Sequence, residues 1–321
     1  MKTKNTLAAA MAATLLAAAP AWAAWPDDKP IEVVVGFAPG GGTDLMARKL
    51  VPFVQKRLGG KAQFVVVNKP GAAGEIANTY VAKAKPDGYT LAVVNMPSFF
   101  FVPMSKKSQY QAEDFQLVAR VIDDPTILLV RSDSKYGSLQ SLVAASKQQP
   151  GSVSFGHNGT GTNGELAITM LSKAAGVQLN AVPYKGTAAQ KTDLLGGHLD
   201  VALVSAGEVP ELHEGAKANV RGLAQLTAKR STALPQVPTA TEASLSVLMS
   251  SERGFAAHKG VPADIVKRLE KAIAEAVMDP EFLAASTDDA LLAYLPGAEW
   301  QKALEPTRKA LQPLVDAQPK N

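Results

Sequence analysis

The sequence contains no cysteine, and only four of its 321 residues are histidine. Without cysteine, the chain has no disulfide framework, no thiolate nucleophile and no thiol for lipid attachment. The histidines form no H-E-x-x-H pair and no G-x-S-x-G motif occurs, so two common signatures of hydrolytic enzymes are missing. Basic residues are scattered rather than interleaved with aromatic residues, which argues against nucleic acid as a partner. These absences favour binding of a small molecule over catalysis.

Long hydrophobic runs are also missing after the first 23 residues, so we expect no transmembrane helix. The first residues have the pattern of an export signal. Lys2 and Lys4 precede an apolar run, and Ala21-Trp22-Ala23 fits the small-x-small rule for cleavage. We expect cleavage between Ala23 and Ala24 and a freely diffusing periplasmic protein. Removal of this segment takes away two lysines and lowers the formal net charge from +4 to +2.

Expected strands and helices alternate along the rest of the chain. The 298 residues after the leader suffice for two domains. The alternation predicts an α/β protein whose mostly parallel sheets are covered by helices on both faces, with ligands beyond the carboxyl ends of the strands. We place one crossing between the domains near Asp123-Asp124-Pro125 and a second before Gly254. The expected strands are residues 31–35, 64–67, 89–94, 115–122, 126–131, 152–155, 180–184, 199–204, 221–227 and 254–258, and the last expected helix is 298–314.

A glycine-rich loop follows the first expected strand. Pro39 and Gly40–Gly42 interrupt regular structure, and Thr43 opens the next helix. Glycines let the backbone approach a ligand closely, and the unpaired N–H groups at the start of a helix attract an anion. We therefore expect a carboxylate or phosphate here, the alternative being a plain tight connection. Asp44 is expected either to cap the loop or to meet an amino group of a ligand.

Other loops that follow strands are expected to face the same cleft between the domains. They lie at residues 95–98, 156–162, 185–187 and 205–207, and they offer N–H groups, hydroxyls and amides that suit a small polar anion. His157 and Lys185 could contact the anion, although a surface position is the alternative for Lys185, and Tyr184 is expected in the pocket wall or the core. The expected ligand-binding residues are Phe37, Ala38, Pro39, Gly40, Gly41, Gly42, Thr43, Asp44, Asn95, Ser98, His157, Asn158, Gly159, Thr160, Gly161, Thr162, Tyr184, Lys185, Gly186 and Ser205.

No metal or cofactor site is expected. The acid pairs Asp123-Asp124 and Asp288-Asp289 have neither the spacing nor the common side-chain direction that a cation site needs. His198, His213 and His258 are expected on the solvated surface.

These loops resemble those of the substrate-binding proteins of tripartite tricarboxylate transporters, the Bug-type receptors. The resemblance covers nearly the whole chain after the leader, and Glu165 and Val102 depart from it at positions where the family often has histidine and asparagine. The segments that carry it are Gly36–Asp44, Asn68–Gly74, Pro86–Leu91, Val182–Gly186, Asp193–Asp200, Ala228–Ser231 and Leu234–Thr239.

The resemblance implies a two-lobed, type II-like periplasmic binding protein, with residues 24–125 and 251–321 in the first lobe and 126–250 in the second. It implies a monomer that closes on a small organic acid, which could be a mono-, di- or tricarboxylate or an amino acid, and delivers it to a membrane permease. Backbone amides of the loops at Phe37–Thr43 and His157–Thr162 would hold the carboxylates. Two alternatives stay open: an exported hydrolase-like enzyme that uses His157, and a ligand-sensing module for a membrane signalling protein.

Overall fold

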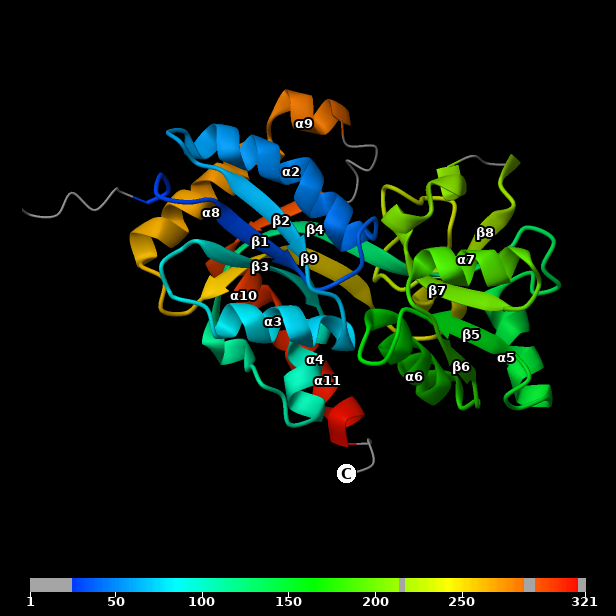
Figure 1. Cartoon of the computed structure of the whole chain (residues 1–321). Helices are drawn as coiled ribbons and strands as arrows, with labels where there is room; N and C mark the ends of the chain where they lie inside the picture. The colour runs from blue at the N-terminus through cyan, green and yellow to red at the C-terminus, as the bar shows by residue number, and fades with distance from the viewer. Residues whose placement is uncertain (1–24, 214–216, 286–291, 317–321) are drawn as a thin grey trace, which may run out of the picture.

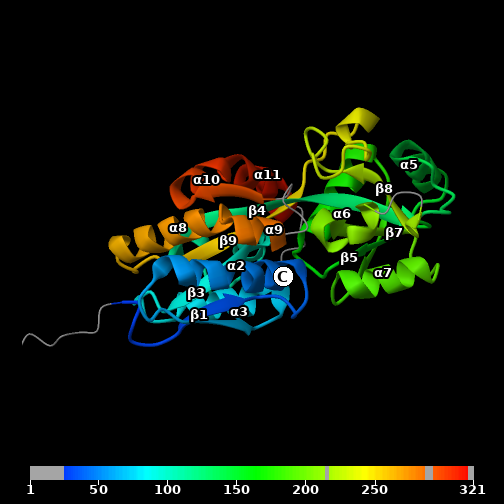
Figure 2. The same ribbon diagram turned by 90° about the horizontal axis from the view of Figure 1, so that it is seen from above.

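The computed structural model describes residues 25–213, 217–285 and 292–316 (Figure 1). The expected leader, its cleavage site and the Asp288-Asp289 pair lie outside these residues. Two α/β lobes lie side by side, and the chain crosses between them in extended segments (Figures 1 and 2).

Strands and helices alternate through most of the described chain. The strands are β1 (Ile31–Val35), β2 (Phe64–Asn68), β3 (Thr90–Met96), β4 (Phe115–Arg131), β5 (Ser154–His157), β6 (Asn180–Pro183), β7 (Val201–Ser205), β8 (Val220–Gln225), β9 (Ser250–His258) and β10 (Leu292–Pro296). The helices are α2 (Gly42–Leu58), α3 (Glu75–Ala82), α4 (Ser98–Ser105), α5 (Leu139–Gln148), α6 (Asn163–Ala175), α7 (Thr187–Leu195), α8 (Ala263–Val277), α9 (Pro280–Ala285), α10 (Gly297–Ala303) and α11 (Glu305–Asp316).

The first lobe is built on the strand order β2-β1-β3-β9-β4, with β10 paired to β4. β1 pairs in parallel with β2 and β3, because α2 and α3 carry the chain back between these strands. Helices α2 and α8 pack on one face of the sheet and contribute to one apolar core. Helices α3, α4, α10 and α11 contribute to the core on the other face.

Helix α8 shows how the sequence directs this packing. Its buried residues Ile265, Leu269, Ala272, Ile273 and Ala276 fall at positions i, i+4, i+7, i+8 and i+11, so they form one apolar stripe. That stripe faces the sheet, while charged residues occupy the solvent side.

The second lobe has the strand order β4-β7-β5-β6, with β8 on the other side of the end of β4. β5 pairs in parallel with β6 and β7, and β4 pairs antiparallel with β7 and β8. Helices α5 and α6 pack on one face of this sheet, and α7 packs on the other. The carboxyl ends of β5, β6 and β7 therefore point toward the first lobe, where their loops meet the loop after β1.

A single long strand, β4, joins the two lobes. Its residues up to Pro125 pair with β9, and its residues from Thr126 pair with β7 and β8. The expectation of two separate extended runs around Asp123-Asp124-Pro125 is therefore wrong. Proline interrupts no pairing here, because the strand exchanges its neighbours at this residue and needs no ladder N–H.

The two-lobed α/β class is confirmed, but the sheets are mixed rather than mostly parallel. The reason is that β4 leaves the first lobe and β9 returns to it, so the two run antiparallel to each other. Several bounds also differ, among them those of β9, which starts at Ser250 instead of residue 254. Helix α4 starts directly after β3, where only an exit loop was expected, and the expected helix 298–314 is two helices that meet at Leu304, preceded by the unexpected β10.

Candidate functional site

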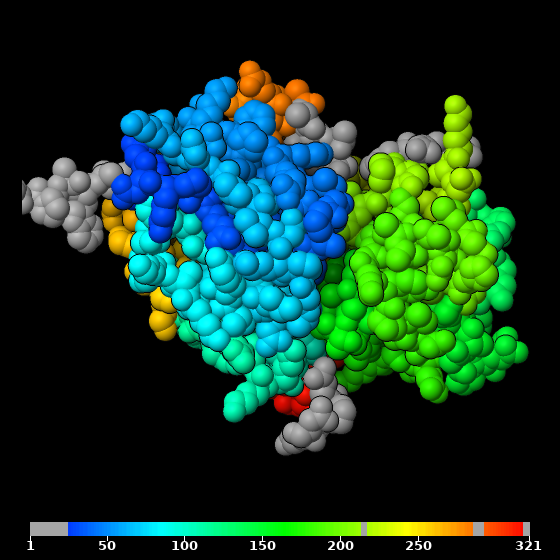
Figure 3. Space-filling view, in the orientation of Figure 1, coloured from blue at the N-terminus to red at the C-terminus, as the bar shows by residue number. Residues whose placement is uncertain are grey.

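A cleft of about 510 Å³ lies between the lobes, along the line where they meet in Figure 3. Loops at the carboxyl ends of β1, β3, β5, β6 and β7 line it, as expected for a sheet of this type. Its lining residues are Phe37, Ala38, Pro39, Gly40, Gly41, Gly42, Thr43, Leu45, Lys49, Asn95, Ser98, Asn158, Thr162, Asn163, Lys185, Gly186, Thr187, Ala188, Lys191, Ser205, Gly207, Glu208, Pro210, Ser251 and Arg253.

A second hollow, of about 690 Å³, lies on the other face of the crossing strands. It is lined by Ser250 and Glu252, whereas Ser251 and Arg253 line the cleft, because successive side chains of a strand point to opposite faces. The cleft holds the polar loops at the strand ends, so it is the candidate site.

The glycine loop after β1 is held in shape by Asp44. Its buried carboxylate accepts hydrogen bonds from the Gly40 N–H at 2.9 Å, from Arg48 at 2.9 Å and from Asn68 at 2.8 Å. Burial alone would raise the pKa of this carboxyl, but these donors outweigh it and lower the pKa. Gly40 has a φ of +80°, a conformation that favours glycine. Asp44 does not line the cleft, so its geometry fits the cap that the sequence suggested as one of two roles.

Gly42, the first residue of α2, lies against groups from distant parts of the chain. Its N–H donates to Oε1 of Glu208 at 3.2 Å. A Cβ atom at this position would lie 2.7 Å from Nη1 of Arg253 and 3.0 Å from Oε1 of Glu208. Only glycine therefore lets the start of α2 approach these two side chains so closely.

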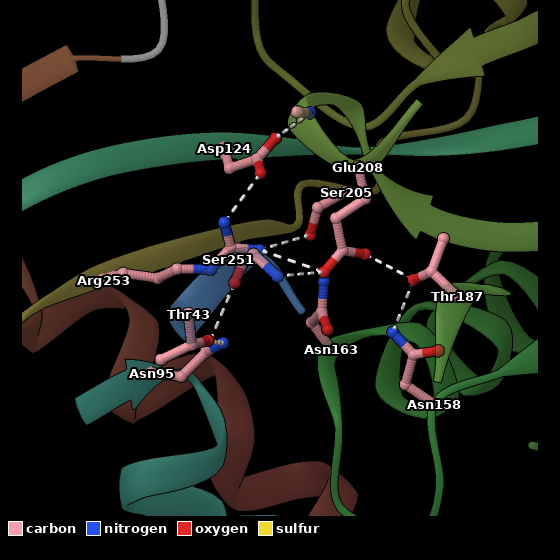
Figure 4. A network of polar contacts seen from close by, with 12 residues as sticks. Thr43, Asn95, Asp124, Asn158, Asn163, Thr187, Ser205, Glu208, Ser251 and Arg253 are labelled. Atoms are coloured by element: carbon pink, nitrogen blue, oxygen red, sulfur yellow. Dashed lines mark hydrogen bonds and ion pairs between the residues drawn. The ribbon is translucent and has the colours of Figure 1, made fainter. Parts of the chain in front are cut away.

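Arg253 lies at the centre of the polar network in Figure 4. Its side chain is almost completely buried, and its guanidinium contacts Asp124 Oδ2 at 3.0 Å and Ser205 Oγ at 3.1 Å. Glu208 Oε1 is 3.8 Å from the same guanidinium. Nε of Arg253 has no hydrogen-bond partner within the described residues. Arg253 comes from β9, whereas Ser205 is the last residue of β7 and Glu208 follows it, so this network joins the two lobes.

Asp124 stands behind Arg253, at the point where β4 crosses between the lobes. It is completely buried, and its Oδ1 accepts a hydrogen bond from the Gly207 N–H at 3.0 Å. Burial raises the pKa of its carboxyl to about 6, although Arg253 and the Gly207 N–H favour the charged form.

Hydrogen bonds fix both walls of the cleft (Figure 4). In the second lobe, Gln190 donates to Asn158, Asn158 donates to Thr187 at 3.1 Å, and Thr187 donates to Oε2 of Glu208. In the first lobe, Asn95 donates to Thr43 at 3.3 Å and accepts from Ser251 at 2.8 Å. Side chains that are held in this way are positioned before a ligand arrives, which lowers the entropic cost of binding.

The glycine-rich loop after β5, residues 158–162, lines the cleft with Asn158 and Thr162, but polar groups of its middle part are bound within the loop and by α6. Gly161 donates its N–H to Oε2 of Glu165 at 2.7 Å, and Thr162 Oγ1 donates to the carbonyl of Gly159 at 2.6 Å. His157 is buried, with Nδ1 3.0 Å from the same carbonyl. The Gly161 N–H, which the sequence suggested as a donor to the ligand, therefore donates to the carboxylate of Glu165 instead.

Fourteen of the twenty expected residues line the cleft, and six do not: Asp44, His157, Gly159, Thr160, Gly161 and Tyr184. The hydroxyl of Tyr184 donates to Asp193 at 2.9 Å instead. Sequence reasoning missed Leu45, Lys49, Asn163, Ala188, Lys191, Glu208, Pro210, Ser251 and Arg253. For Arg253 a signal was available, since it is a lone arginine beside the apolar run that forms the end of β9.

The described residues hold no group of three or more histidine, aspartate or glutamate side chains placed to bind a metal ion.

The fold and the cleft define a two-lobed solute-binding protein. A family model described as the tripartite tricarboxylate transporter family receptor matches residues 46–307. The chain therefore belongs to this receptor family.

Individual relatives agree with this assignment. The protein BugT of Bordetella pertussis is 35% identical over 263 residues, which is 80% of this chain and 79% of BugT. The solved structure of Rpa4515 from R. palustris with adipate has a TM-score of 0.80 and 26% identity, and the match covers 91% of this chain and 97% of that one. MatC from Rhodopseudomonas palustris with bound malate has a TM-score of 0.79 and 26% identity, covering 89% and 98%.

Proposed function

We propose that this chain is the solute receptor of a tripartite tricarboxylate-type transporter and that it binds a small carboxylate in the cleft between its lobes. The observation that carries the proposal is the charge of the cleft wall. Of the described residues, four with cationic side chains line it, Lys49, Lys185, Lys191 and Arg253, against one with a carboxylate, Glu208. Adipate and malate in two structural relatives support the same ligand class.

We further propose that the ligand is enclosed by a hinge motion. The lobe boundaries would fall at Pro125/Thr126, where β4 exchanges its neighbouring strands, and at Ser250/Ser251, where β9 begins. A hinge concentrates the change of backbone angles in a few residues, and two extended crossings provide such residues.

The location and partners belong to this proposal. Among the described helices, none is long and apolar enough to cross a membrane. The leader-like first 23 residues support export to the periplasm, with cleavage after Ala23, and the family supports a membrane permease as the partner of a monomeric receptor.

We propose no catalytic role. His157, the residue on which a hydrolase would depend, is buried outside the cleft lining. The ring of His157 and the hydroxyl of Thr162 both contact the backbone carbonyl of Gly159, so the loop directs neither group toward a substrate.

The experiment is thermal unfolding of the mature chain with a panel of carboxylates, amino acids, sugars and phosphates. A ligand that binds only the folded state stabilises it by about 2.7 kcal/mol at a hundredfold excess over its Kd. Replacement of Lys185 by alanine should reduce the shift, whereas replacement of Lys173, an exposed lysine on α6, should not.

Stabilisation by sugars or phosphates alone would overturn the proposal. So would the lack of any shift in protein that mass spectrometry of the denatured supernatant shows to carry no copurified ligand.

A further inference from the structure

Among the residues that the structure describes, Glu208 is the one acidic side chain in the cleft lining, and it reaches across from the second lobe to the first. Its Oε1 accepts the Gly42 N–H at 3.2 Å, and its Oε2 accepts the Thr187 hydroxyl. The side chain is 15% exposed, so a ligand in the cleft can meet it, but water screens its charge only weakly.

A chain of hydrogen bonds within the second lobe fixes the position of the Glu208 side chain. Thr187 is held by Asn158, and Asn158 by Gln190, a fully buried residue of α7. A carboxylate at the end of such a chain is part of the wall of the second lobe. Three hydrogen bonds in series thus hold it at its place in the cleft.

In the group formed by Glu208, Arg253 and Asp124, the single cation is already paired with carboxylates. Arg253 faces two carboxylates, Asp124 at 3.0 Å and Glu208 at 3.8 Å. When both acids are ionised, the three side chains carry a net charge of −1. A ligand carboxylate placed against this group would meet a like charge in a poorly screened site, which is strongly unfavourable.

Free cationic charge is found elsewhere in the wall. Lys191 pairs with Glu211, but Lys49 and Lys185 take part in no ion pair within the residues that the structure describes. The cleft thus offers cations for one carboxylate of a ligand and a fixed acceptor for a different kind of group.

We propose that Glu208 determines the specificity of the cleft by selecting a ligand with one carboxylate and a hydrogen-bond donor, an amide or an ammonium, at its other end. The inference rests on the proposed function, because it assumes that the cleft binds carboxylates. Glu208 accepts the donor group, and it rejects a second carboxylate at the same place.

The test compares diacids with their half-amides, which have nearly the same shape. Calorimetry measures the Kd of succinate, succinamate, adipate and adipamate for the wild type, for Glu208→Gln and for Glu242→Gln. Glu242 is an exposed glutamate of the second lobe that pairs with Arg230 outside the cleft, so its substitution controls for the loss of one negative charge. Melting curves of each protein show that it is folded.

The wild type should bind a half-amide at least tenfold more tightly than its diacid, and Glu208→Gln should shift this ratio at least tenfold toward the diacid. Glu242→Gln should leave the ratio unchanged. Equal ratios in the wild type and Glu208→Gln would overturn the inference while leaving the proposed function intact. An equal decrease in the Kd of diacids and half-amides in Glu208→Gln would also overturn it. Glu208 would then only compete with the ligand carboxylate for the same hydrogen-bond donors. Failure of all four compounds to bind either protein would overturn the proposed function itself.

Discussion

Asp124 and Arg253 form a buried ion pair of 3.0 Å between the two strands that cross from one lobe to the other. Asp124 is on β4 and Arg253 on β9, 129 residues apart in the chain. Both side chains are almost fully buried, so neither charge is compensated by water. The pair therefore couples the packing of the hinge to the electrostatics of the cleft.

Removal of Arg253 alone should strongly destabilise the fold. Arg253→Met leaves the carboxyl of Asp124 buried without its cation, which typically costs about 3–5 kcal/mol. The double variant Asp124→Asn with Arg253→Met should regain much of this loss, because it removes the fully buried carboxylate of Asp124 together with its cation. Urea denaturation measures both, and Arg230→Met, at an exposed pair with Glu242, should cost less than about 1 kcal/mol. Equal losses at Arg253 and Arg230 would contradict a buried pair.

Asp124 should also leave a mark on the pH dependence of stability. Its pKa is about 6 in the folded chain, against 3.8 as the ordinary value, so the folded state binds more protons between these pH values. The contribution of Asp124 to stability is therefore fully present below about pH 4 and is lost as the pH rises through 6, by about 1.4 kcal/mol per unit of pKa difference. Subtracting the urea stability curve of Asp124→Asn from that of the wild type should isolate this decline. A flat difference between pH 4 and 7 would show that the pKa is not raised.

The sequence was sufficient for those parts of the fold that depend on local signals. The β-branched run of β1, the glycines after it and the apolar stripe of α8 each predict their own structure, because periodicity and backbone freedom are local properties. The long strand β4 was not predictable in the same way. Its continuity through Pro125 depends on strands from both lobes that pair on either side of that residue.

The cleft was predictable only where it is made of loops at strand ends. Arg253 and Glu208 were missed because their roles depend on contacts over long distances in sequence, such as the 166 residues between Gly42 and Glu208. His157 was expected in the cleft because it lies in the predicted glycine-rich loop 156–162, but it is the last residue of β5 and its side chain is buried beside Gly164. A glycine loop shows that the backbone can approach a ligand, but not which of its neighbours face it.

The two roles suggested for Asp44 can be separated by mutation. Asp44→Ala removes the acceptor of the Gly40 N–H and of two side chains, and hydrogen bonds to a charged group contribute about 1.5–3 kcal/mol each at most. We expect lower stability and an equal loss of affinity for a carboxylate and for its α-amino derivative, measured by calorimetry. A loss confined to the amino compound would instead place Asp44 in contact with the ligand.

Gly42 and its neighbour Gly41 provide a matched pair of substitutions at the start of α2. A Cβ on Gly42 would meet Arg253 at 2.7 Å, whereas a Cβ on Gly41 would meet only the carbonyl of Ala38 at 3.4 Å. Gly41 has a φ of −77°, which alanine adopts without strain. Gly42→Ala should therefore cost about 1–3 kcal/mol, as overpacking does, and weaken ligand binding at least tenfold. Gly41→Ala should change the stability by less than about 1 kcal/mol and keep most of the affinity. The reverse order of effects would mean that the approach of α2 to Arg253 and Glu208 is not needed for a closed cleft.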